Sequence, residues 1–224
     1  MYKCVLHILL LACLVSCGPD AGEKVQNVDL HHSVVLDEGS LLLDKVKDMA
    51  WENDSVLVIV DSSQDGFLHF VCLSDNKVVA ECGRIGQGPG EFLLVGPVYP
   101  DVNNRLVLFD VNKQECFMQQ NGEKGTSFRS LFHAGDSLVY FELLPIQHNR
   151  YIVTGLLQDN RFSLLDENGK RVYGFGEYPY RDKEESRVDG FIRGDVYQGR
   201  MAANPHRNRF VQAMYKAKIL TFYQ

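Results

Sequence analysis

The chain has 224 residues, of which 45% are hydrophobic and 23% are charged, as in one or two ordinary globular domains. Its formal net charge is −6. A protein that binds a nucleic-acid backbone needs a basic stripe, so the charge argues against a nucleic-acid partner.

The N-terminal segment, 1–40, indicates a targeting signal and a tether rather than a folded domain. An apolar run, 4–15, follows a short positive start and is too short to span a bilayer, as in a signal peptide. The run leads through Ser16 to Cys17, and this order resembles the lipobox of bacterial lipoproteins, in which the cysteine becomes the lipidated N-terminus. The resemblance predicts a signal peptide over 1–16, lipid attachment at Cys17 and a tether over 17–40. The alternative is a plain secretory peptide that happens to contain cysteine.

From residue 41 onward the sequence predicts an all-β domain. Residues 41–54 are compatible with one short helix ended by Asn53 and Asp54, with Trp51 packed in the core. After it, short runs rich in β-branched and aromatic residues alternate with turn residues. The predicted strands are 56–61, 67–73, 77–83, 105–110, 115–120, 137–144, 150–157, 161–166, 170–176, 209–215 and 218–224.

A repeat separates a propeller from a sandwich. Similar strands begin at Val56, Arg105, Arg150 and Arg209, and the last interval is the longest because it includes the charged loop. A second pair of segments, beginning at Leu73 and Leu165, each carry an Asp/Asn turn, a lysine, an apolar strand and a closing glycine. Steps of about 40–50 residues with four short strands each are typical of propeller blades, and the intervals here are close to that length.

The segment 84–92, RIGQGPGEF, is rich in turn residues. We interpret Gly86, Gly88, Pro89, Gly90, Glu91 and Phe92 as a structural corner between two blades, because glycine tolerates positive φ and Gly-Pro-Gly builds turns. A dinucleotide-binding loop would need a glycine where Glu91 stands and a helix directly afterwards.

Other residues are candidates for chemistry. Asp61, Asp110 and Asp166 recur after apolar strands, and we favour turn capping over cation or sugar binding for them. No histidine or cysteine has the spacing of a metal site, so no metal and no cofactor are expected. Cys72, Cys82 and Cys116 are predicted to be small buried hydrophobes without disulfides. Tyr178 and Tyr180, beside the mixed-charge run 181–187, are the better candidates for exposed ligand contacts.

The lipobox, the strand at 56–61 and the GQGPGEF stretch together resemble the TolB-like six-bladed β-propeller lipoproteins of Bacteroides-type bacteria. The resemblance extends from about residue 41 to the C-terminus and implies a six-bladed ring. Residues 41–224 suffice for only about four blades, so we expect a truncated member of the family or a smaller ring.

The functional prediction is a lipid-anchored protein of the cell envelope, on the periplasmic or surface face of the membrane. It would act as a non-enzymatic binding or scaffold module for an envelope protein or a glycan. The alternative is a propeller enzyme of the lactonase or glycan-hydrolase type, which requires convergent carboxylates or a bound calcium. No catalytic residue is identified, because no carboxylate pair can be placed on one face of a strand or turn.

Overall fold

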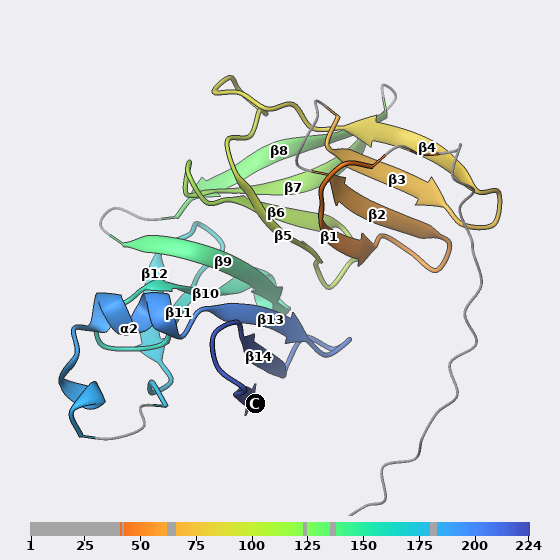
Figure 1. Ribbon diagram of the computed structural model, residues 1–224. Helices are drawn as coiled ribbons and strands as arrows, with labels where there is room; N and C mark the ends of the chain where they lie inside the picture. Colours follow the sequence, from red (N-terminus) through yellow and green to blue (C-terminus); the bar gives the residue numbers. More distant parts are fainter. Residues whose placement is uncertain (1–40, 42, 62–65, 123–124, 135–137, 180–182) are drawn as a thin grey trace, which may run out of the picture. The chain divides into compact units, whose positions relative to one another are not determined.

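The structure is a computed structural model that describes residues 41, 43–61, 66–122, 125–134, 138–179 and 183–224. Cys17 and Tyr180 therefore lie outside the described residues, as do the expected signal peptide and tether. The described residues form four antiparallel sheets, each a meander of consecutive strands (Figure 1).

Three sheets have four strands and the last has three. The first sheet contains β1 (Val46–Trp51), β2 (Val56–Asp61), β3 (Leu68–Cys72) and β4 (Lys77–Cys82). The second contains β5 (Val95–Pro100), β6 (Leu106–Asp110), β7 (Glu115–Gly122) and β8 (Gly125–His133). The third contains β9 (Val139–Ile146), β10 (Arg150–Leu156), β11 (Phe162–Leu165) and β12 (Arg171–Phe175), and the fourth β13 (Gly199–Ala203), β14 (Phe210–Met214) and β15 (Leu220–Tyr223). Short helical turns η1 (Gln147–Asn149) and η2 (Glu185–Arg187) and the helix α2 (Gly190–Val196) lie in connections.

The sheets are arranged as the blades of a β-propeller. The first strands of successive sheets contact one another: β1 contacts β5, β5 contacts β9, and β9 contacts β13. We call this set of first strands the hub. The four runs of the predicted repeat are the second strands β2, β6, β10 and β14, so the repeat is confirmed. The longest interval of the repeat, between β10 and β14, contains α2 and the loop around it.

The apolar cores lie between neighbouring blades. Leu106 and Leu108 of β6 pack against the first blade, whereas Val107 and Phe109 of the same strand pack against the third blade. Side chains alternate between the two faces of a strand, so a middle strand covered on both faces is apolar throughout. This is why the second strands are uninterrupted apolar runs in the sequence.

The prediction of a short helix within residues 41–54 is wrong. Residues 46–51 form the strand β1, which pairs with β2 in a register that places Met49 opposite Ile59. Pairing with an apolar strand overrides weak local helix propensity. The expected burial of Trp51 is also wrong, because Ala50 faces the core and Trp51, on the opposite face of the strand, is 52% exposed.

Candidate functional site

The segment 84–92 forms a closed turn between β4 and β5. The backbone N–H of Phe92 donates to the carbonyl oxygen of Arg84 at 2.8 Å, and Gly86 N–H donates to Phe92 O at 2.9 Å. The Glu91 carboxylate folds back into the turn, where Oε2 accepts a hydrogen bond from Gly88 N–H at 2.8 Å. The turn is therefore built around its own glutamate.

This geometry explains the glycines of the segment. A Cβ atom on Gly86 would lie 2.1 Å from Glu91 Oε2, so the carboxylate occupies the space of a side chain there. Gly90 has a φ of +73°, which favours glycine. Phe92 closes the turn as a buried plug against Phe67 and Phe117, at ring-centroid distances of 5.3 and 4.6 Å.

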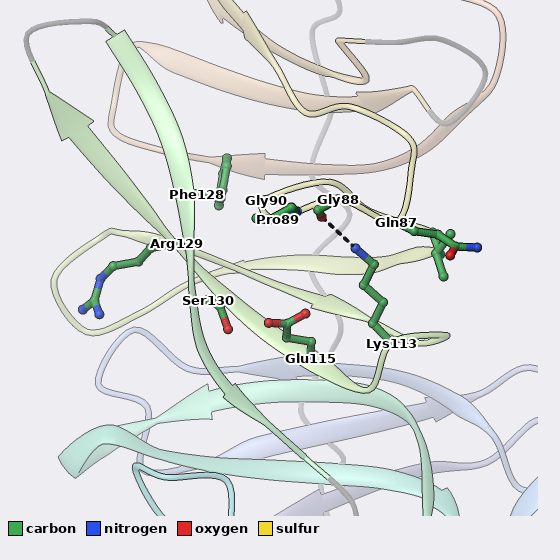
Figure 2. Close-up of a pocket in the computed structure, with 10 residues that line it drawn as sticks. Gln87, Gly88, Pro89, Gly90, Lys113, Glu115, Phe128, Arg129 and Ser130 are labelled. Carbon is green, nitrogen blue, oxygen red and sulfur yellow. Dashed lines mark hydrogen bonds between the residues drawn. The ribbon is translucent and has the colours of Figure 1, made fainter.

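The second blade holds this turn in place through Asp110 and Lys113. Asp110 Oδ2 accepts from Leu93 N–H at 2.5 Å, and Asp110 Oδ1 accepts from Lys113 N–H at 3.0 Å. The Lys113 ammonium group then donates to the carbonyl oxygen of Gly88 at 3.3 Å (Figure 2). It also donates to the carbonyl oxygen of Glu91 at 2.7 Å. Side chains and backbone of two blades thus fix one wall of a cavity.

The cavity itself has a volume of about 900 Å³ and lies between this turn and the outer strand of the second blade. It is lined by Gln87, Gly88, Pro89, Gly90, Leu93, Lys113, Glu115, Phe128, Arg129 and Ser130. Phe128 points toward Gly90 and Pro89, whereas Arg129 extends away from them (Figure 2). Within the described residues, neither Arg129 nor Glu115 forms an ion pair.

Three consecutive residues of β8, 128–130, line this cavity. Successive side chains of a strand point to opposite faces, so a cavity that touches all three lies over the edge of the strand. β8 is the last strand in the hydrogen-bonding order of its sheet. The cavity therefore opens onto an edge strand, where backbone groups lack a partner strand.

The recurring aspartates bind backbone amides. Asp61 accepts from the N–H groups of Asp44 and Lys45, and Asp110 plays the same part in the second blade. Asp166 accepts from Asn168 and Lys170 in the β11–β12 turn. Asp110 also accepts from Asn112 and Lys113 N–H in the turn after its own strand, so turn capping is confirmed for Asp110 and Asp166. For Asp61, the hydrogen bonds given above go instead to amides that precede β1. No group of three or more potential metal ligands occurs within the described ranges.

The remaining predicted residues have mixed outcomes. The expected exposure of Tyr178 is wrong: its ring is buried beside Tyr197, and its hydroxyl donates to Leu157 O at 2.9 Å. Its apolar ring packs inside while the polar end finds a backbone partner. Cys72, Cys82 and Cys116 are free thiols, as predicted, but only Cys116 is fully buried.

Sequence reasoning missed a polar cluster in the hub, to which each blade contributes one side chain. The four side chains are Asp48 of β1, Tyr99 of β5, Glu142 of β9 and Arg200 of β13. Arg200 Nη2 lies 2.5 Å from Asp48 Oδ2, and the Tyr99 hydroxyl is hydrogen-bonded to Glu142 Oε1 and to Met201 O. Three of these four residues lie on first strands that the sequence did not predict. A glutamate inside the apolar strand 137–144 was the available signal.

Burial controls the ionisation of this cluster. It raises the pKa of Glu142 to about 7, because desolvation outweighs the hydrogen bonds from Tyr99 and from Met201 N–H and the charge of Arg200. Glu142 Oε2 is buried without a hydrogen-bond partner, which is costly for a charged carboxylate. The Tyr99 hydroxyl has one proton and two oxygen neighbours, so a protonated Glu142 supplies the second proton that this arrangement needs.

These sheets and their shared hub define a β-propeller. The family described as TolB-like 6-blade propeller-like matches residues 29–224, and the chain belongs to this family. It is also similar to the crystal structure of a member of the DUF4221 family from Bacteroides vulgatus, with a TM-score of 0.50 and 11% sequence identity. That similarity covers 84% of this chain and 59% of the other, so the chain spans less than two thirds of that protein's length. At this identity the similarity shows the fold alone.

No curated protein matches the chain. Among the described residues, none of the helices has the length and apolarity needed to cross a membrane.

Proposed function

We propose that the chain is a lipid-anchored protein of the cell envelope whose propeller binds a protein or glycan ligand without transforming it. The family is generally associated with the envelope, and the residue order before Cys17 supports anchoring through an acylated cysteine. Several acyl chains on one residue hold a protein stably on a membrane, whereas one myristoyl chain does so only marginally.

The observation that carries the binding role is the open cavity of about 900 Å³ at the edge of β8 (Figure 2). It combines a turn fixed by hydrogen bonds, a half-buried aromatic ring, and groups of both charges in Arg129 and Glu115. Rigid walls with a few polar groups are typical of binding sites.

Of the two ligand classes, the geometry of this cavity favours a protein segment. An extended peptide can add to the edge of β8 through main-chain hydrogen bonds. Its side chains would then contact Phe128 on one face of the strand and Arg129 on the other. If the bound ligand proves to be a glycan, the assignment to a protein segment is replaced.

Anchoring is tested by labelling with tritiated palmitate in a Bacteroides-type host. The wild-type chain should carry label and sediment with membranes, and Cys17→Ser should carry none. An unlabelled wild-type protein in the membrane fraction would rule out attachment through Cys17.

Binding is tested by identifying envelope proteins that co-purify with the wild-type chain and measuring the affinity of the purified partner. Glu115→Lys combined with Arg129→Glu should weaken this affinity at least tenfold, while Lys77→Glu, an exposed change on β4, should leave it unchanged. Equal affinity of the wild-type chain and both variants would show that the partner does not bind at this cavity. Chemical conversion of the captured partner would contradict a non-enzymatic role.

A further inference from the structure

A second cavity, of about 360 Å³, lies between the third and fourth blades. Its mouth is formed by the β9–β10 and β13–β14 hairpins, and its interior by the facing sheets of the two blades. Gln147 Nε2 donates to His206 O at 2.6 Å, and Arg207 Nη1 donates to Pro145 O at 3.4 Å, so hydrogen bonds join the two hairpins. None of its lining residues belongs to the cavity of Figure 2.

The charge of this cavity contrasts with that of the chain. Arg150, Arg207, Arg209 and His148 line it, and no aspartate or glutamate does, although the chain has a net charge of −6. Over the part of the chain that the structure describes, none of the three arginines forms an ion pair.

Arg207 is the least exposed of the three arginines. Burial lowers the pKa of the Arg207 guanidinium group, and the opposing effect of Asp101 is smaller. The charge of Arg207 is therefore only partly compensated. Arg207 and the neighbouring His148 both have positive φ angles, of 55° and 61°. Non-glycine residues in this region are strained, and such strain is concentrated at functional sites.

Aromatic rings form the rest of the cavity. Phe210 and Tyr223 are stacked with ring centroids 4.6 Å apart, and Phe175 packs against both. Tyr173 lies 5.8 Å from Phe175 and is 54% exposed, so its ring presents an open face at the cavity. Guanidinium groups bind carboxylates with paired hydrogen bonds, and a flat ring face packs against an apolar face of a ligand.

We propose that this cavity binds an acidic sugar unit, with its carboxylate held by Arg150, Arg207 and Arg209 and its ring against Tyr173. The volume is at the lower end of the range for small-molecule sites, which suits one sugar ring. This site goes beyond the proposed function, because it shares no lining residue with the cavity at β8, to which a protein segment is assigned.

The test measures binding of glucuronate, glucose and inorganic phosphate to the full chain by ligand-observed NMR and by calorimetry. Glucuronate should bind at least tenfold more tightly than glucose, and added salt should weaken it. Arg150→Gln combined with Arg209→Gln should reduce glucuronate affinity about tenfold, and Tyr173→Ala should reduce it severalfold. Arg129→Gln, at the other cavity, should have no effect.

Each other outcome has a clear meaning. Absence of glucuronate binding at millimolar concentrations, or binding that the double arginine variant leaves unchanged, would overturn the site. Phosphate binding as tight as glucuronate binding, together with no effect of Tyr173→Ala, would overturn the assignment to a sugar. Melting temperatures of the variants show whether they fold. The glucuronate measurements concern only this cavity, whereas the proposed function is tested by partner binding at the cavity beside β8. A failure of glucuronate binding is therefore distinguishable from a failure of the proposed function.

Discussion

At the scale of single residues, the glutamate in the hub couples folding to protonation. The pKa of Glu142 is raised from 4.5 to about 7 by burial, so the folded chain holds this proton more tightly than the unfolded chain. Stability therefore falls as pH rises from about 4.5 to about 7 and is constant in this respect outside that window. The contribution of this group is on the order of 3 kcal/mol.

Glu142→Gln should remove this pH dependence, since an amide keeps a similar shape and has no proton to lose. Urea unfolding at pH 5 and pH 8 measures the free energy of unfolding of both chains. The wild-type chain should lose more stability than the variant between the two values. Equal losses would show that Glu142 is not the titrating group.

Predictions for single residues were most accurate where the side chain binds groups close to it in the sequence. The capping aspartates follow from their place after apolar strands, because a carboxylate close to free backbone amides binds them. Glu142 and Arg200 could not be paired from the sequence, since their contact depends on how separate blades meet. The exposure of Tyr178 was also misjudged, because Tyr197 and the Leu157 carbonyl group, which it contacts, are distant from it in the sequence.

At the scale of elements, the strands buried on both faces were predicted and most first strands were not. The second strands are continuous apolar runs, so composition alone identifies them. β1, β5 and β13 face the polar hub on one side, and β5 contains two prolines. Their sequences therefore carry little strand signal, and only pairing with a neighbouring strand fixes them.

The edge strand β15 gives a prediction at this scale. Leu220 and Phe222 on β15 are 57% and 73% exposed. β15 is the last strand of a sheet that has three strands rather than four. An exposed apolar edge promotes association between chains, and lysine suppresses it. The chain expressed from Gly18 onward, without the lipidated cysteine, should self-associate, and Leu220→Lys with Phe222→Lys should reduce this association.

Sedimentation velocity at several concentrations measures the effect. Val172→Lys, on the outer strand β12 of a complete four-stranded sheet, is the control and should associate like the wild-type chain. A wild-type chain that remains a monodisperse monomer at all concentrations would contradict the role of β15.

At the scale of the whole molecule, the spacing of the repeat predicted the architecture. Strands that recur at similar intervals along the chain became equivalent strands of successive blades, and turn residues marked the connections. The two candidate cavities could not be predicted in the same way, because each is assembled from strands and turns of different blades. For that reason the ligands are inferred from the structure and not from a motif.

Blades distant in the sequence meet at a common hub, where Asp48 of β1 contacts Arg200 of β13. These residues are 152 positions apart and belong to the first and fourth blades. A double-mutant cycle with Asp48→Asn and Arg200→Gln, measured by urea unfolding, should give a coupling energy of about 1–3 kcal/mol. Additive effects within about 0.3 kcal/mol would contradict the meeting of the blades at the hub.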